Sequence, residues 1–134
     1  MLQFSTTLRN NRLDQITSTV SNAALLKIYS GTPPANTTAA LSGNTELASL
    51  TCASPFASSA SSGVLTVGSI TSANAIATGT ATFFRIYDSG NTTCYIQGTV
   101  TATGGSGDMT ISTTYLTSGG SVTVTGFTIT EANN

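Results

Sequence analysis

Few residues of this chain have side chains that could do chemistry. Its 134 residues include no histidine, two cysteines, five acidic side chains and four basic ones. Without histidine, a serine or cysteine nucleophile would depend on Lys27 or a carboxylate as its base, and neither an S-x-x-K nor a G-x-S-x-G pattern occurs. Asp88 and Asp108 could form the carboxylate pair of a glycosidase, but both lie among turn-forming residues, where aspartate commonly binds nearby backbone N–H groups. We therefore predict no catalytic residue and no enzyme activity.

The sequence offers equally little for a metal or a cofactor. Transition metals favour His and Cys ligands and calcium needs clustered carboxylates, and the spacing supplies neither. The glycine-rich residues 104–107 indicate a turn and not a nucleotide-binding loop, because no helix and no GK[ST] ending follows them. Cys52 and Cys94 lie in strand-like runs without CxxC spacing. We predict that they are reduced core residues, with a disulfide as the alternative.

The charge pattern argues against two classes of partner. The basic residues Arg9, Arg12, Lys27 and Arg85 are too few and too scattered to neutralise a phosphate backbone, so no direct contact with nucleic acid is expected. No apolar run approaches the 18 or so residues that span a bilayer, so no membrane association is expected either. The N-terminal residues lack the basic start and apolar stretch of a signal peptide, which predicts synthesis without Sec-type export.

The composition indicates a β-rich protein that takes part in an assembly. The chain contains 27 Thr and 18 Ser, which favour strands and turns, and only 7% charged residues, against about 25% in typical soluble proteins. So few charges give little repulsion between molecules, which suits a subunit whose surface is covered by neighbours. A stable secreted β domain is the alternative interpretation.

The hydrophobic pattern predicts one helix followed by strands. Residues 8–20 place Leu8, Leu13, Ile16 and Val20 on one helical face, with a cap among residues 5–7 and a stop at residues 21–22. Strands are expected at residues 23–29, 46–52, 63–70, 80–88, 92–102, 108–112 and 121–130. The fold class predicted is all-β, an antiparallel β-sandwich or jelly-roll-like fold with one short N-terminal α-helix. We expect a single domain over residues 1–134, with residues 1–22 as an arm and helix and residues 23–134 as the β body.

Two features of the strands carry more specific predictions. The apolar parity of the last strand switches at Gly126, which predicts a β-bulge there. The segments LLKIYSG (residues 25–31) and FFRIYDSG (residues 83–90) resemble each other. Either two core strands converge on one pattern, or the segments occupy equivalent places in two sheets, with Lys27 and Arg85 on similar faces.

Residues 80–100 form the clearest element, a hairpin that turns at residues 88–91. We expect its outward face to be covered by another strand or by a neighbouring subunit, and we expect Arg85→Glu to leave the isolated fold largely intact. The side chains predicted to point inward are Phe84, Ile86, Cys94, Ile96 and Val100, and those predicted to point outward are Arg85, Tyr87, Tyr95, Gln97 and Thr99.

Four stretches carry a resemblance to a known family: LRNNRLDQI, KIYSGTPP, ATGTATFFRIYDSGNTTCYIQGTV and VTVTGFTITEANN. Together they resemble a family of small proteins of tailed bacteriophages and prophages that are encoded among the virion structural genes. The resemblance implies a virion component without catalysis, such as a decoration or cement protein that binds the major capsid protein or other virion proteins. Self-association, for example as a trimer, is expected for such a subunit.

The parts that would reach neighbouring molecules are the N-terminal segment with its helix and the loop of residues 30–42. Residues 1–4 are either a frayed end, which we favour, or an arm that docks on a neighbour. The alternative function is a neck or tail component, or a tail-tip module that binds host glycans through Tyr29, Tyr87, Tyr95 or Tyr115. The candidate interface residues are Phe4, Arg9, Arg12, Arg85, Tyr87, Tyr95 and Gln97.

Overall fold

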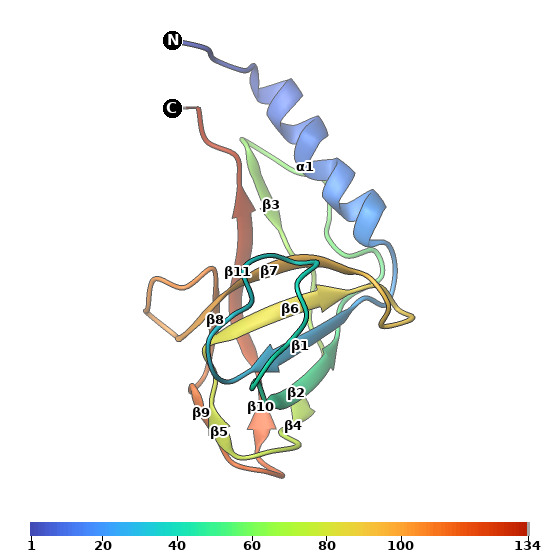
Figure 1. Cartoon of the computed structure of the whole chain (residues 1–134). Helices are drawn as coiled ribbons and strands as arrows, with labels where there is room; N and C mark the ends of the chain where they lie inside the picture. Colours follow the sequence, from blue (N-terminus) through green and yellow to red (C-terminus); the bar gives the residue numbers. More distant parts are fainter. Residues whose placement is uncertain (134) are drawn as a thin grey trace.

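The computed structural model describes residues 1–133, and it is mostly β with one helix, α1 (Thr6–Val20), at the N-terminal end (Figure 1). The long strands lie where the alternating pattern predicts them, whereas β4, β5 and β9 are two-residue strands that the pattern does not mark. The strands of the described residues are β1 (Leu25–Tyr29), β2 (Glu46–Thr51), β3 (Val64–Thr66), β4 (Ala73–Asn74), β5 (Gly79–Thr80), β6 (Phe83–Tyr87), β7 (Cys94–Ala102), β8 (Met109–Ile111), β9 (Tyr115–Leu116), β10 (Ser121–Val122) and β11 (Val124–Thr130).

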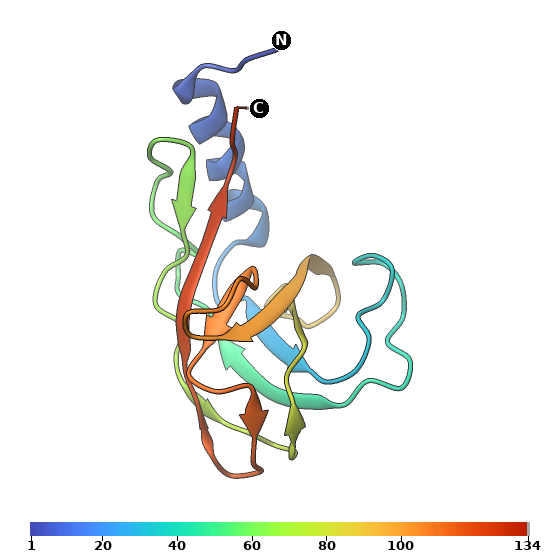
Figure 2. The same cartoon turned by 90° about the vertical axis from the view of Figure 1, so that its left-hand side faces the viewer.

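Seven strands form one large sheet in the order β2-β1-β6-β7-β8-β11-β3, and two short pairs, β10-β4 and β5-β9, lie outside it. Neighbouring strands are antiparallel except β7 and β8, which run parallel with Val100 opposite Met109 and Ala102 opposite Ile111. The predicted antiparallel arrangement is therefore wrong at this pair, and the sheet is mixed. Figure 2 shows how strongly the sheet twists between β1 and the long, nearly vertical β11.

The parallel pair results from a tight return of the chain through residues 103–108. The Asp108 carboxylate accepts hydrogen bonds from the backbone N–H and the hydroxyl of Thr99, both at 2.8 Å. A Cβ at Gly105 or Gly107 would lie 2.5 or 2.9 Å from Thr101, so glycine is needed for the loop to lie this close to β7. Parallel strands usually need a connection of about a dozen residues or more. The turn is predicted correctly, but its close contacts with β7 decide the direction of β8.

Capping residues set the bounds of the helix, as the sequence predicts. The Ser5 side chain accepts a hydrogen bond from the Leu8 N–H at 3.2 Å. Ser21 ends the helix with φ 65°, and its N–H donates to the Thr17 carbonyl at 3.0 Å. Both ends therefore have part of their free backbone groups bonded.

Only part of the predicted apolar helix face is buried. Leu13 and Val20 are buried, whereas Leu8 is 44% exposed, so the prediction is wrong at Leu8. The loop before β3 meets the helix at Asn10, whose side-chain oxygen accepts a hydrogen bond from the Gly63 N–H at 2.9 Å. Leu8 lies beyond this contact and has no sheet beneath it.

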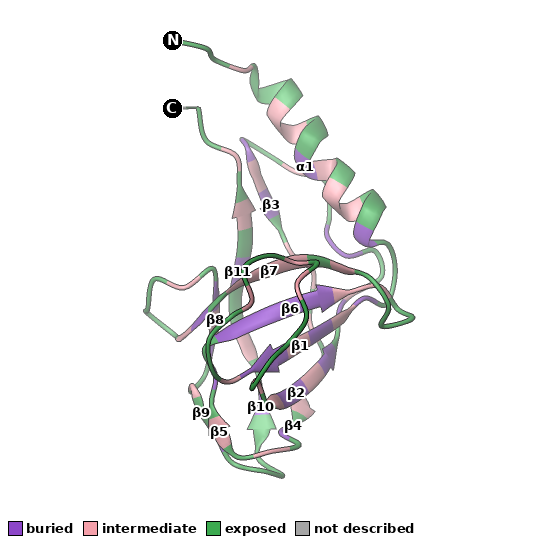
Figure 3. Ribbon diagram, in the orientation of Figure 1, coloured by how far each residue is buried: buried purple, intermediate pink, exposed green. Residues whose placement is uncertain are grey.

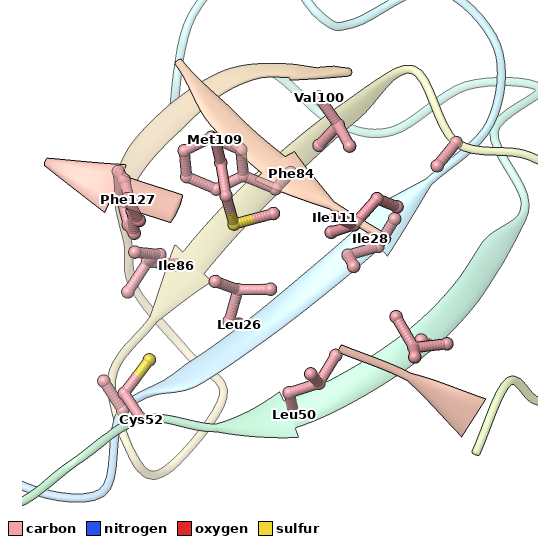
Figure 4. Packing of buried hydrophobic residues seen from close by; sticks show 14 of the residues in the cluster. Leu26, Ile28, Leu50, Cys52, Phe84, Ile86, Val100, Met109, Ile111 and Phe127 are labelled. Atoms are coloured by element: carbon pink, nitrogen blue, oxygen red, sulfur yellow. The ribbon is translucent and has the colours of Figure 1, made fainter. Parts of the chain in front are cut away.

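Hydrophobic side chains from the helix, the large sheet and the loops form one buried cluster (Figures 3 and 4). Phe84 and Ile86 of β6 and Val100 of β7 are buried, as predicted for the inward face of the hairpin. Ile96 is only half-buried, because β8 covers β7 from Val100 onward and leaves the start of β7 open. The inward prediction is wrong for Cys94, because the register of β6 and β7 shifts between Ile86 and Tyr87 and places Cys94 opposite Tyr87, on the face of Arg85.

The predicted bulge in the last strand is confirmed. The register of β11 against β8 shifts between Val124 and Gly126, so the side chain of Phe127 turns into the core. Its ring packs edge-to-face on Phe84 at a centroid distance of 5.0 Å. One glycine therefore changes the face of β11 that is buried.

The two similar segments of the sequence are neighbours in one sheet. Strands β1 and β6 pair antiparallel with Leu26 opposite Ile86 and Lys27 opposite Arg85. The hypothesis that these segments occupy equivalent places in two sheets is wrong. Lys27 and Arg85 do share a face, and the two cations lie side by side on it.

Candidate functional site

Arg85, which is predicted to point outward, is one of the most deeply buried polar residues of the described chain, at 3% exposure. The loop of residues 31–44 folds across the outer face of β1, β6 and β7 and covers the guanidinium group (Figures 1 and 3). Arg85 Nη2 donates to the carbonyls of Asn36 and Ala39 at 2.9 Å each, and Arg85 Nε donates to Gln97 Oε1 at 2.8 Å. Arg85 is therefore covered by a loop of its own chain, and its prediction as a residue that contacts a neighbouring subunit is wrong.

Gln97 extends the same network, so it too contacts the chain itself. Its Nε2 donates to the Pro34 carbonyl at 2.8 Å, while its Oε1 accepts from Arg85. The ends of the loop are tied down separately, because Asn44 Nδ2 donates to the Thr32 carbonyl at 2.8 Å and Thr82 Oγ1 donates to the Gly31 carbonyl at 2.6 Å. The loop, predicted as a part that reaches a neighbour, is bound to its own sheet.

The second cation of this face is neutralised by a carboxylate. Lys27 Nζ lies 3.0 Å from Glu46 Oε2, and it also lies 6.0 Å from the centre of the half-buried Tyr87 ring. Tyr29 is buried against Phe83, with ring centroids 5.2 Å apart, and this burial raises the pKa of Tyr29 well above its usual value. Tyr29 therefore packs on the sheet, and its hydroxyl is not poised for proton transfer near neutral pH.

A hollow of about 380 Å³ opens beside Arg85. Threonine hydroxyls, the Tyr87 ring and the Cys94 thiol line it, and burial raises the pKa of that thiol. A neutral thiol without a neighbouring base is a poor nucleophile. The hollow can therefore donate hydrogen bonds, but its lining holds no group suited to acid–base or nucleophilic chemistry.

The predicted N-terminal residues form a clasp with the C-terminal tail. The Phe4 N–H and carbonyl bond the Asn133 side-chain amide at 2.8 Å each, and the Arg12 guanidinium lies 5.2 Å from the centre of the Phe4 ring. Arg12 forms an ion pair with Glu131, and Arg9 Nη1 donates to the Glu131 carbonyl at 3.0 Å. The structure thus brings Phe4, Arg9 and Arg12 together. The frayed end predicted for residues 1–4 therefore extends only to the residues before Phe4, of which Met1 is 97% and Leu2 76% exposed.

Tyr95 points outward as predicted and is 38% exposed. It borders a groove that sequence reasoning misses, which we call the β7–β11 groove. Two hollows of about 330 and 320 Å³ make up this groove and share Ile16 and Ile96. Its main lining residues are Ile16, Ile96, Gln97, Phe127, Thr128 and Ile129. No local pattern marks it, because it exists only where β7 and β11 diverge beyond β8.

The charged side chains share a property that composition alone does not reveal. Each of the nine makes a hydrogen bond or an ion pair within the chain. Several of the acids bond backbone N–H groups. Hydrogen bonds from the Thr92 hydroxyl and N–H lower the pKa of Asp88, and hydrogen bonds from the Thr99 N–H and hydroxyl lower the pKa of Asp108. The nine are Arg9, Arg12, Asp14, Lys27, Glu46, Arg85, Asp88, Asp108 and Glu131.

Comparison with family models, with curated proteins and with solved structures finds no match to this chain. Among residues 1–133 no group of three or more His, Cys, Asp or Glu side chains is placed to hold a metal ion. Over the same residues no helix is long and apolar enough to cross a membrane. Cys52 and Cys94 are both free thiols, in line with the prediction of reduced residues.

Proposed function

We propose that this chain is a structural protein of a tailed-bacteriophage virion, a capsid decoration or cement protein that binds the lattice of the major capsid protein and has no catalytic role. The observation that supports this function best is the state of the charges. All nine charged side chains are already bonded within the chain, so a neighbour can cover this surface without leaving a charge unpaired. An unpaired buried charge costs several kcal/mol, about 3–5 when a buried pair is broken.

The proposed subunit also needs a body that does not deform on binding. The clasp of Phe4 with Asn133 and the network of Arg85 tie the chain ends and the longest loop to the sheet. We further propose that the mixed sheet folds into a sandwich or jelly-roll-like body, because Phe84 of β6 meets Phe127 of β11 across the core. Such a body binds with little loss of conformational entropy.

The second candidate function is a neck or tail component, or a tail-tip module that binds host glycans. Tyr115, at 62% exposure, and Tyr95, at 38%, favour it, because exposed aromatic rings can stack on sugars. Tyr29 is 3% exposed and cannot contribute to such stacking. Copy number separates the candidates: several hundred copies per particle support decoration, whereas a few to a few dozen support the neck or tail.

Binding to heads is the direct test. Purified protein added to heads that lack it should bind them and raise their resistance to heat. Because the charges are internally bonded, binding should change little between low and high salt, whereas an interface of free charges would weaken as salt screens it. Protein that neither binds heads nor protects them from heat would exclude the decoration role.

A further inference from the structure

The β7–β11 groove is bounded by two strand edges that have no partner strand. Strand β8 pairs with β7 only from Val100 to Ala102, and with β11 only as far as Phe127. Within residues 1–133, the start of β7 is therefore open on the side away from β6, and the end of β11 is open on the side away from β3. The groove lies between these two open edges.

Alternation along each strand fixes which backbone groups face the groove. The Val100 N–H donates to Thr82 on the β6 side, so the Gln97 N–H, three residues away and within the regular part of the pairing, points to the groove. On β11, the Phe127 carbonyl accepts from Val67 on the β3 side, so Thr128 and Thr130 present their backbone groups to the groove. An extended peptide laid between the edges could bond both.

The side chains of the groove select an apolar, uncharged occupant. Ile16, Ile96 and Ile129 are half-buried and Phe127 is 8% exposed, so a covering side chain would complete their burial. The nearest charged groups, Arg12 and Asp108, are already bonded, Arg12 to Glu131 and Asp108 to Thr99. A charged side chain over this lining would therefore lose its water without gaining a partner.

The chain itself carries a segment of this description. The residues before the clasp, Met-Leu-Gln, are non-helical and carry no charged side chain, so the α-amino group of Met1 is their only charge. Met1 and Leu2 are the most exposed large hydrophobic residues of the described chain. Figures 1 and 2 show this segment leading away from the sheet at the end where the two termini lie. Its exposed side chains have no partner within their own subunit.

The segment cannot fill the groove of its own subunit. Phe4 is fixed by its two hydrogen bonds to Asn133. From Phe4 the Leu2 Cα reaches at most about 7 Å. Ile16, at the centre of the groove, lies about 16 Å further along the helix from Ser5, given a rise of about 1.5 Å per residue. The occupant must come from another molecule.

We propose that the β7–β11 groove binds the N-terminal Met1, Leu2 and Gln3 of a second copy of this chain as an added strand, with Leu2 over Ile96 and Ile129. This inference specifies how the proposed virion subunit would self-associate, and it rests on the proposed function only for the expectation that the subunit self-associates. Reciprocal insertion gives a closed dimer, and insertion in a ring gives a closed trimer.

Sedimentation equilibrium of the full-length protein over a range of concentrations tests the proposal. The native protein should associate to a multiple of its monomer mass, and Leu2→Asp should remain monomeric. Ile76→Asp is the matched control, because Ile76 is 61% exposed and lies outside the groove lining. A native protein that stays monomeric throughout, or a Leu2→Asp protein that associates as the native one does, would overturn the proposal.

Disulfide trapping identifies the contact itself. In a Cys94→Ser background, a Leu2→Cys protein mixed with an Ile129→Cys protein should form a mixed disulfide, because Ile129 lies on the face of β11 that Leu2 would cover. Thr123→Cys, exposed and away from the groove lining, should not. Equal trapping by Thr123→Cys would contradict the proposed contact.

Amide hydrogen exchange separates this inference from the proposed function. The Gln97 and Thr128 amides should be protected in the associated native protein and exchange fast in Leu2→Asp. Protection that arises only on heads would mean that another virion protein fills the groove, which overturns the inference and leaves the proposed function standing. Groove-bound oligomers that do not bind heads would support the inference and exclude the decoration role.

Discussion

Replacing Arg85 by methionine should destabilise the fold, although the sequence suggests a tolerant exposed site. Arg85 is 3% exposed and donates three hydrogen bonds of 2.8–2.9 Å, to two loop carbonyls and to Gln97. Hydrogen bonds from a charged donor contribute about 1.5–3 kcal/mol each. The carbonyls of Asn36 and Ala39 belong to a surface loop and regain water when the loop opens. The lower end of that range therefore applies to each of the three bonds. Burying the guanidinium also costs desolvation free energy, which offsets part of their sum, so we expect a net loss of about 3 kcal/mol in the free energy of unfolding.

Urea unfolding measures this loss. With a dependence of about 2 kcal/mol per molar urea, a 3 kcal/mol loss lowers the midpoint by about 1.5 M. Lys27→Met is the matched control, because Lys27 lies opposite Arg85 on the same face but holds one partly exposed ion pair. We expect about 1 kcal/mol or less for it. Arg85→Lys should fall between, since an ammonium group cannot reproduce the fork of the guanidinium.

Arg85→Glu should be at least as destabilising as Arg85→Met, because it sets a carboxylate against two carbonyl oxygens and Gln97 Oε1. The prediction that this variant keeps the isolated fold largely intact is therefore replaced. If Arg85→Met shifted the midpoint no more than Lys27→Met does, the loop would not depend on this network and the reasoning would be refuted.

Three further predictions concern other parts of the fold. Gly63→Ala should lower the free energy of unfolding by about 1–3 kcal/mol, which is more than Gly104→Ala should. Both glycines have positive φ, but only at Gly63 would the added Cβ collide with another group, 2.5 Å from Arg9. Equal shifts of the urea midpoint in the two variants would contradict this. Burial raises the pKa of Cys52 to about 11, so this thiol should react with a thiol reagent at pH 8 only after unfolding; rapid labelling of the native protein would disprove it. Backbone and side-chain hydrogen bonds from Thr99 lower the pKa of Asp108. The carboxylate therefore stabilises the fold at pH values above its unfolded-state pKa, and this stabilisation is lost as the pH falls through its folded-state pKa. Acid unfolding of Asp108→Asn should lack this loss of stability, and a profile identical to that of the native protein would count against the prediction.

Several predictions from the sequence hold because their causes are local. The helix bounds follow from Ser5 and Ser21, the hairpin from alternating residues around a turn, and the bulge from the parity switch at Gly126. Each depends on residues only a few positions apart. Periodicity and capping therefore suffice to place them.

The errors share a different cause. Alternation along β6 shows that Phe84 and Arg85 face opposite sides, but not that both sides are covered. Arg85 is buried by the carbonyl of Asn36, 49 positions earlier, and Arg9 is engaged by Glu131, 122 positions later. No local pattern encodes such contacts, so the predicted interface included Arg85 and Arg9, whose guanidinium groups bond distant segments of the same chain.

By itself the sequence determined a β-rich chain with one capped helix, few charges and reduced cysteines, because composition, periodicity and spacing depend only on neighbouring residues. Only the tertiary structure decided that all nine charged side chains are bonded internally and that β8 runs parallel to β7. It also decided where a surface remains open: β8 begins only at Met109, so β7 and β11 diverge before it and leave two strand edges unpaired. These features depend on contacts between segments that are far apart in the sequence, and the stability of each contact depends on which groups the fold brings together there.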